Sequence, residues 1–197
     1  DQFVLKDIDL NIADGEQVLF VGQNGAGKSS LMRTILGEYI PTSGSVAIDG
    51  FDSFKQRSRA LRGISFVPQT PPPLKLSLNE LIYFAERTAD ASRADIVKFC
   101  GEMELDLSSN LNKPFHKLSG GMKQKFLIAL AFGRASKAMI FDEPTANLDS
   151  KTGSGIIALL SELRAQYGTT IVLTSHDEHI LQKADRCIAL HDGIIAE

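Results

Sequence analysis

The sequence predicts an α/β fold that carries a helical insertion near its middle. Short apolar runs typical of buried strands alternate along the chain with stretches that have the spacing of amphipathic helices. A glycine-rich loop at residues 22–30 joins one of these strands directly to a helix, and a proline-rich stretch at 68–80 opens the insertion. Because 43% of the 197 residues are hydrophobic and 23% are charged, we expect a single folded unit with one core.

The first third of the chain predicts three strands and one helix. Residues 7–12 (DIDLNI) alternate between polar and apolar side chains, which indicates a half-buried strand. Residues 18–22 (VLFVG) form a continuous apolar run, which indicates a core strand. The helix that follows the glycine-rich loop is expected to end at Gly37. Two turns then bracket residues 45–48 (SVAI), as in an antiparallel hairpin.

The rest of the chain predicts a strand, the helical insertion and a second alternating segment. Residues 63–69 (GISFVPQ) form another buried strand that runs into a loop. Ser77 and Glu80 have the spacing of a capping box, so we expect a helix that begins at Ser77. Helical sequence continues from there to about His116. Further strands are expected at 138–141, 169–174, 186–190 and 193–197, and a helix at 150–168.

Charge and the length of the apolar runs exclude several classes of protein. The net charge of −3 arises from 21 basic and 24 acidic residues without a long run of either sign, so we expect no direct contact with nucleic acid. The longest apolar stretches, 126–132 and 169–174, are far shorter than the roughly 20 residues that span a bilayer.

Cys100 and Cys187 lack metal-site spacing, and we expect both to be buried thiols outside any disulfide. Because the sequence begins at Asp1 rather than methionine, we expect it to be part of a longer chain.

The glycine-rich loop satisfies the pattern G-x-x-x-x-G-K-[ST] with Gly22, Gly27, Lys28 and Ser29. In this pattern, backbone N–H groups and the N-terminus of the next helix bind phosphate, the lysine reaches the β and γ oxygens, and the hydroxyl binds Mg²⁺. The pattern requires a strand before the loop and a helix after it, and both are expected here. The loop alone leaves kinases, GTPases and ATPases open.

Two adjacent acidic residues end the strand expected at 138–141. Because side chains alternate along a strand, Asp142 and Glu143 are expected to point in different directions. One carboxylate can hold the water shell of Mg²⁺ while the other orients the attacking water and accepts its proton. A solvated acidic pair is the alternative, and the nearby phosphate loop favours the catalytic interpretation.

These residues resemble the ATP-binding cassette (ABC) ATPases, and the resemblance covers nearly the whole chain. The motifs of the family occur in order: a Walker A loop at 22–29, the Q-loop Gln69, the signature LSGGM at 118–122, Walker B Asp142 with Glu143, the D-loop at 147–149 and the switch histidine His176. The resemblance implies a P-loop NTPase core with a mixed sheet, an antiparallel β subdomain and an inserted helical subdomain. The implied boundaries within the single domain 1–197 are 1–68 and 118–197 for the core and 69–117 for the helical subdomain.

The resemblance also implies a role for each site residue in the binding and hydrolysis of ATP with Mg²⁺. Ser29, Gln69 and Asp142 are implied to hold the metal. The implied catalytic residues are Glu143, which polarises the attacking water, His176, which contacts the γ-phosphate, and Gln69, which senses the nucleotide. The residues implied to contact ATP are Gly22, Gln23, Asn24, Gly25, Ala26, Gly27, Lys28, Ser29, Ser30, Ser119, Gly120, Gly121 and Asp149.

The second glycine-rich segment, LSGGM, implies a second cassette as partner. In this family two cassettes pair head to tail, and the signature loop of one covers the γ-phosphate bound at the Walker A loop of the other. Lys117, Lys123 and Lys125 surround Ser119, and a helix that follows would direct the positive end of its dipole at an anion. Asp149 is implied to bridge the two cassettes, which are identical or related.

The sequence departs from the family pattern at three places. Met122 replaces the commoner glutamine of the signature, and Lys125 replaces a common arginine while keeping its charge. The aromatic residue that usually stacks on adenine would lie a few positions before residues 4–10 (VLKDIDL), and we expect the sequence to begin too late to contain it; Phe3 is a weak substitute. We expect Phe3 to be a core residue, so the preference for adenine rests on the resemblance.

The resemblance implies the ATP-hydrolysing subunit of a membrane transporter, held at the cytoplasmic face of the membrane by a transmembrane partner. Residues 71–76 and the helix from Ser77 lie where such subunits grip that partner, and Leu74 is either a contact residue or a core residue. The sequences GMKQK and FVPQ resemble those of bacterial exporters more than those of sugar or amino-acid importers. Two alternatives remain: a non-transport ABC ATPase that acts on nucleic acid or ribosomes, and a small-molecule kinase, which would have no use for LSGG.

Overall fold

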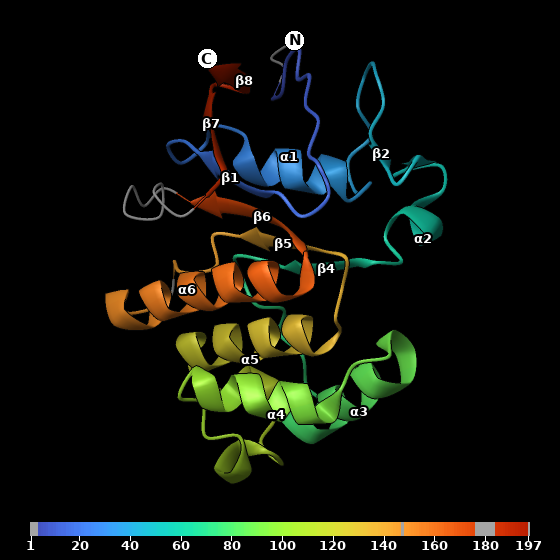
Figure 1. Ribbon diagram of the computed structural model, residues 1–197. Coiled ribbons are helices and arrows are strands. Elements are labelled where there is room, and N and C mark those ends of the chain that lie inside the picture. Colours follow the sequence, from blue (N-terminus) through green and yellow to red (C-terminus); the bar gives the residue numbers. More distant parts are fainter. Residues whose placement is uncertain (1–3, 147, 176–183, 197) are drawn as a thin grey trace.

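The computed structural model describes residues 4–146, 148–175 and 184–196, and it confirms the α/β class (Figure 1). Among these residues, six strands form the main sheet and two form a hairpin. The strands are β1 Gln17–Val21, β2 Ala47–Ile48, β3 Phe51–Asp52, β4 Ile64–Val67, β5 Ala138–Asp142, β6 Thr170–Ser175, β7 Arg186–His191 and β8 Ile194–Ala196. The helices are α1 Lys28–Ile35, α2 Arg57–Ala60, α3 Leu78–Ala89, α4 Arg93–Glu102, α5 Gly120–Gly133 and α6 Ser150–Tyr167, with 3₁₀ turns at Ser108–Asn110 and Phe115–Lys117.

The main sheet has the strand order β4-β5-β6-β1-β7-β8. Its neighbours are parallel from β4 to β7, and β8 pairs antiparallel with β7, so the predicted mixed sheet is confirmed. The predicted antiparallel hairpin is also present, as β2 and β3. Because parallel strands end at the same edge of a sheet, the segments that follow β1, β4 and β5 converge there.

Helices cover both faces of the main sheet (Figure 1). On one face, Phe20 of β1 belongs to an apolar cluster with Leu31 and Met32 of α1. On the other face, Leu19 belongs to a larger cluster with Phe126 of α5 and Leu160 of α6. Burial on both faces explains why β1 has a continuous apolar sequence. Among the described helices, none combines the length and the apolar character that a membrane span needs.

The insertion forms α3 and α4: α4 packs against α5, and α3 packs against α4. The capping box predicted at the start of α3 is confirmed: the backbone N–H of Glu80 donates to the Ser77 hydroxyl, and the N–H of Ser77 donates to the Glu80 carboxylate at 2.7 Å. At the contact between α4 and α5, the rings of Phe99 and Phe132 meet edge to face with centroids 4.9 Å apart. Since α5 also contacts β4, it connects the insertion to the sheet.

Two local predictions are wrong, and the structure favours one of the two alternatives for Leu74. Residues 7–12 keep their alternation of half-buried and exposed side chains, but they form no strand, because they pack against the sheet side chains without joining a ladder. Cys100 is buried as expected, whereas Cys187 is exposed, because it lies on the outward-facing side of β7, whose buried side chains are Ile188 and Leu190. Leu74 is half-buried and packs against the core, which favours the alternative that it is a core residue.

Candidate functional site

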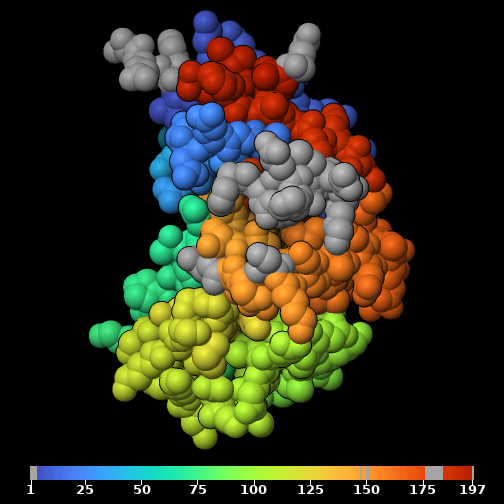
Figure 2. All heavy atoms as spheres, turned by 90° about the vertical axis from the view of Figure 1, so that its left-hand side faces the viewer, coloured from blue at the N-terminus to red at the C-terminus, as the bar shows by residue number. Residues whose placement is uncertain are grey.

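The carboxyl edge of the main sheet gathers most of the predicted site residues. The glycine-rich loop follows β1, Gln69 follows β4, and Glu143 directly follows Asp142 at the end of β5. Figure 2 shows this face of the molecule, where blue atoms of the α1 region lie above the orange segment after β5 and the yellow segment that contains the start of α5. Ligands of parallel α/β sheets bind at this edge, so the topology places the predicted residues where a nucleotide can reach them.

The backbone of the glycine-rich loop depends on its glycines. Gly27 caps the N-terminus of α1 in a left-handed conformation with φ of 105°, which residues with a side chain rarely adopt. At Gly22, an added Cβ would collide with the carbonyl oxygen of Leu190 on β7. At Gly25, an added Cβ would meet no other described atom within 4 Å, so this part of the loop is open to a ligand. The loop therefore has the form of an anion site at a helix N-terminus.

Lys28 is held by the loop and by Glu143. Its Nζ donates hydrogen bonds to the carbonyl oxygens of Gly22 at 2.7 Å and Gln23 at 3.2 Å. The same nitrogen lies 3.2 Å from Oε1 of Glu143, and the two side chains are only 6% and 4% exposed. A buried charge without a partner is costly, so the ion pair stabilises both groups. An anionic ligand that binds Lys28 must therefore compete with Glu143.

Hydroxyl groups connect the loop with the two acidic residues. Ser29 Oγ donates to Oδ1 of Asp142 at 3.1 Å, and Thr174 Oγ1 donates to the same oxygen at 2.8 Å. Thr174 Oγ1 also accepts the backbone N–H of Glu143 at 2.8 Å. Sequence analysis missed Thr174, because the only signal is the register that places it opposite Asp142 on the neighbouring strand. The site is thus one connected network from the loop through β5 to β6.

The oxygen atoms of Ser29 and Asp142 suit a magnesium ion that also binds a substrate phosphate. Mg²⁺ is usually held by one or two carboxylates together with water and phosphate oxygens. Within residues 4–146, 148–175 and 184–196, no group of three or more His, Cys, Asp or Glu side chains is placed to hold a metal by itself. The donor set therefore fits Mg²⁺ delivered with a nucleotide better than a metal site made only of protein ligands.

The signature segment lies at the start of α5. Ser119 is the N-cap of this helix, and its hydroxyl accepts the N–H of Met122 at 3.2 Å. Ser119 and Gly120 are exposed, and an added Cβ at Gly120 would meet no other described atom within 4 Å. The fold does not require a glycine there for reasons of space, so the open position leaves the helix N-terminus accessible to an anion from outside.

Gln69 and Asp149 are further predicted site residues that the structure describes. Gln69 is exposed just after β4. Asp149 is the N-cap of α6: its carboxylate accepts the backbone N–H of Thr152 at 3.0 Å and the hydroxyl of Thr152 at 2.7 Å. These two hydrogen bonds, the backbone one first, lower the pKa of the Asp149 carboxyl. His176 and Asn147 lie outside the described residues.

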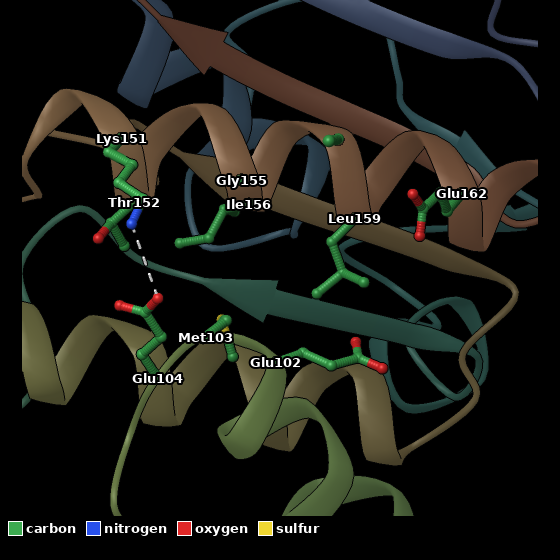
Figure 3. Close-up of a pocket in the computed structure, with 10 residues that line it drawn as sticks. Glu102, Met103, Glu104, Lys151, Thr152, Gly155, Ile156, Leu159 and Glu162 are labelled. Carbon is green, nitrogen blue, oxygen red and sulfur yellow. Dashed lines mark ion pairs between the residues drawn. The ribbon is translucent and has the colours of Figure 1, made fainter.

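Two cavities of the described structure lie away from the glycine-rich loop. One, of about 300 Å³, is lined by α6 and by the end of α4 with the residues after it, and Figure 3 shows Glu102, Glu104 and Glu162 on this lining. Lys151 lies 3.9 Å from Glu104 there. The other, of about 1130 Å³, is lined in part by the β2–β3 hairpin and the end of α6. Neither cavity is lined by a residue of the glycine-rich loop. The three carboxylates that line the first cavity disfavour the binding of a triphosphate there.

Comparison with known proteins agrees with the geometry of the site. The family model described as "ABC transporter" matches residues 5–146. The chain belongs to the ABC transporter family. This cassette is 36% identical over 200 residues to the lipoprotein-releasing system ATP-binding protein LolD of Syntrophotalea carbinolica, which covers 98% of the cassette and 88% of LolD.

Two further relatives are longer than the cassette. The macrolide export ATP-binding/permease protein MacB of a Shewanella species is 33% identical over 210 residues, which cover 98% of the cassette and 30% of MacB. The uncharacterized ABC transporter ATP-binding protein y4fO of Sinorhizobium fredii is 34% identical over 198 residues, which cover 98% of the cassette. The cassette spans 58% of the length of that relative.

Solved structures of ABC cassettes share the fold of the whole chain. A dimeric post-hydrolysis state of the ATP-binding cassette MJ0796, bound to ADP and Pi, matches with a TM-score of 0.87 and 30% identity over 100% of this cassette and 90% of that chain. A bacterial Atm1-family ABC exporter with ATP bound matches with a TM-score of 0.84 and 27% identity over 98% of this cassette and 35% of that chain. These matches confirm the predicted family, fold class and ATPase class, and the small-molecule kinase alternative is wrong.

Proposed function

We propose that the cassette binds and hydrolyses ATP to power an ABC membrane transporter, and that ATP closes two cassettes against each other. The observation that carries this proposal is the network that links the glycine-rich loop to Asp142 and Glu143. Such a network places a phosphate-binding lysine, an oxygen pair for a metal and a buried carboxylate at one edge of the sheet.

Each residue of the network has a distinct task in hydrolysis. Lys28 and the N–H groups of the loop bind the β and γ phosphates, which the open backbone around Gly25 allows to approach. Ser29 and Asp142 hold Mg²⁺, with Gln69 as a further ligand. Bound Mg²⁺ neutralises charge on the phosphate oxygens. The carboxylate of Glu143 orients the attacking water and accepts its proton.

The ion pair between Lys28 and Glu143 couples nucleotide binding to the availability of the base. A triphosphate carries more negative charge than one carboxylate, so it draws the Nζ of Lys28 away from Oε1 of Glu143. The released carboxylate can then hydrogen-bond to water. The base therefore becomes available when its substrate is in place.

The signature loop serves the phosphate bound by a second cassette, identical or related. Figure 1 shows α1, which begins at the glycine-rich loop, and α5, which begins at the signature, on opposite faces of the main sheet. The exposed Ser119 and the open space at Gly120 allow a phosphate held by another chain to dock at the start of α5. The dimeric state of the MJ0796 cassette supports this arrangement. Asp149, fixed as the N-cap of α6, is the proposed bridge between the cassettes.

The transmembrane partner binds the helical subdomain, residues 69–117, through exposed apolar side chains. Leu76, Tyr83 and Phe84 are 44%, 56% and 59% exposed, whereas Leu74 packs inward. Apolar side chains that gather at a surface mark contacts with other proteins. This contact would hold the cassette at the cytoplasmic face of the membrane. The names of LolD, a lipoprotein-releasing protein, and MacB, a macrolide exporter, favour export over import.

Crosslinking of the full-length protein in its native membrane tests this assignment. We expect Tyr83→Ser combined with Phe84→Ser to abolish crosslinks to a protein with several membrane spans, while the ATPase rate and the melting temperature of the cassette stay unchanged. Val97→Ser on α4, which alters a side chain that is 49% exposed, is the matched control and should keep the crosslinks. Association of the wild-type protein with ribosomes or nucleic acid instead of a membrane protein would support the non-transport alternative. That the cassette does not bind nucleic acid directly stays a prediction.

A further inference from the structure

Thr174 is a buried polar residue of the network to which no role has yet been assigned. Its side chain is 0% exposed, and β6 places it opposite Asp142 of β5. Its hydroxyl makes two hydrogen bonds of 2.8 Å, one from the backbone N–H of Glu143 and one to Oδ1 of Asp142. One hydroxyl thus contacts two consecutive residues at the end of the neighbouring strand.

The direction of both hydrogen bonds follows from the chemistry of the partners. A backbone amide can only donate, and a carboxylate can only accept. The oxygen of Thr174 therefore faces the amide of Glu143, and its hydrogen points to Asp142. Serine can make the same two bonds, whereas valine has the shape of threonine and can make neither.

The backbone of Glu143 needs such a restraint. Its φ is 48°, in the left-handed region that residues with a side chain rarely adopt. Unusual backbone conformations persist only where neighbouring groups hold them in place. The bond from the Glu143 amide to Thr174 fixes the start of this turn, and the bond from the Ala146 amide to the Glu143 carbonyl oxygen, at 3.2 Å, closes it.

The same hydroxyl also fixes the carboxylate of Asp142. Oδ1 of Asp142 accepts hydrogen bonds from Thr174 on one side and from Ser29, in the glycine-rich loop, on the other. Two donors on one oxygen restrict rotation of the carboxylate. Loss of the Thr174 donor would leave Ser29 as the partner on that oxygen among the described residues.

We propose that Thr174 is a positioning residue for ATP hydrolysis, which orients the backbone of Glu143 and the carboxylate of Asp142 through a single hydroxyl. It acts through these residues and does not touch the reacting atoms. The inference rests on the roles proposed above for Asp142 and Glu143. Partners that orient catalytic and metal-binding groups typically contribute 10- to 100-fold to activity or metal affinity.

Four variants of the purified cassette separate positioning from general stability. Thr174→Val removes both hydrogen bonds and keeps the shape, and Thr174→Ser keeps both bonds. Thr174→Cys, with a weak S–H donor, is an intermediate variant that serves if the valine protein does not fold. Thr170→Val is the matched control, because Thr170 lies on the same strand and its hydroxyl accepts the N–H of Gly15 at 2.9 Å, outside the network.

Three measurements on each variant test the proposal. Phosphate release under saturating ATP should fall roughly 10- to 100-fold in Thr174→Val and stay within about 3-fold of wild type in Thr174→Ser and Thr170→Val. The affinity for ATP should change by less than about 3-fold in all of them, since Lys28 and the loop remain intact. Hydrogen exchange of the Glu143 amide should become at least about 10-fold faster in Thr174→Val but not in Thr174→Ser or Thr170→Val, because the valine variant lacks an acceptor for that amide.

Several results would overturn the proposal. Phosphate release by Thr174→Val within about 3-fold of wild type excludes a positioning role, as does an unchanged exchange rate of the Glu143 amide. A Thr174→Ser protein as slow as Thr174→Val would show that shape matters and the hydroxyl does not. Glu143→Gln is assayed in parallel, to distinguish failure of the proposed role of Glu143 from failure of the role of Thr174. A Glu143→Gln protein that hydrolyses ATP at the wild-type rate refutes the role of Glu143. If Glu143→Gln hydrolyses ATP slowly while Thr174→Val keeps the wild-type rate, only the role of Thr174 is refuted.

Discussion

Glu143→Gln should have opposite effects on nucleotide binding and on hydrolysis. The substitution keeps the size of the side chain and removes its charge, so it removes the ion pair with Lys28. Because a triphosphate competes with Glu143 for Lys28, the variant should bind ATP more tightly than wild type. Because the amide cannot accept the proton of the attacking water, the same variant should hydrolyse ATP slowly and accumulate as a closed dimer.

The size of both effects follows from the structure. At a separation of 3.2 Å and an effective dielectric constant of about 20, the attraction between Lys28 and Glu143 is about 5 kcal/mol. Most of this is offset by the desolvation of two buried charges, and Lys28 keeps its bonds to the carbonyl oxygens of Gly22 and Gln23. We therefore expect a net gain of about 1 kcal/mol in nucleotide binding, which corresponds to roughly 3- to 10-fold in Kd. Loss of a general base should slow hydrolysis by roughly 10²- to 10⁴-fold.

Titration with a non-hydrolysable ATP analogue and a phosphate-release assay measure the two effects separately. Glu162→Gln is the matched control, because it makes the same acid-to-amide change on α6 at an exposed position and should alter neither quantity. A Kd equal to or weaker than that of wild type would refute the competition for Lys28. Phosphate release close to the wild-type rate would remove Glu143 from the role of base.

Two further predictions concern packing and exposure. Gly133→Ala should destabilise the cassette by about 1–3 kcal/mol, because the added methyl collides with Ile96 at the contact of α4 and α5. Gly101→Ala, where the added methyl meets no described atom within 4 Å, should be neutral or stabilising; equal melting temperatures of the two variants would contradict this. A thiol reagent at neutral pH should label Cys187 in the native protein and Cys100 only after unfolding, since Cys100 is buried and burial raises its pKa to about 12. Peptide mass spectrometry identifies the labelled cysteine. Labelling of Cys100 in the native protein as fast as that of Cys187 would show that the core opens readily.

The sequence predicts best the features that depend on contacts between residues close together in the chain. The left-handed cap at Gly27 is a requirement of one loop, which the glycine and lysine spacing of the sequence identifies. The capping box of Ser77 and Glu80 is likewise a contact between residues three positions apart. Such features could be recognised without knowing which strands are neighbours.

Features that depend on pairing between distant segments could not be predicted in this way. Thr174 joins the network only because β6 lies beside β5 in a register that sets it opposite Asp142. The ion pair of Lys28 with Glu143 also joins segments far apart in the chain. Residues 7–12 show the converse, because a period of two predicts which side chains turn inward but not whether a partner strand accepts the segment.

The choice between Leu74 and its exposed neighbours shows a second limit of the sequence. Leu74 and Leu76 are two positions apart and chemically identical, yet one packs against the core and the other is 44% exposed. Only the path of the proline-rich loop distinguishes them. The surface proposed for the transmembrane partner therefore required the structure, although its region was predicted.

The most direct test of the proposed function asks whether the signature loop contacts the phosphate bound by the glycine-rich loop of its own chain or by that of a partner. Lys28→Ala should empty a nucleotide site, and Ser119→Arg should fill the space in front of α5, so each homodimer should trap no ATP. In a mixed heterodimer that also carries Glu143→Gln in both chains, one site combines both lesions, while the other joins an intact Lys28 to an intact Ser119. After heterodimer formation is verified by crosslinking, we predict one tightly held ATP per heterodimer. Crosslinked heterodimers that hold no ATP would contradict the head-to-tail arrangement.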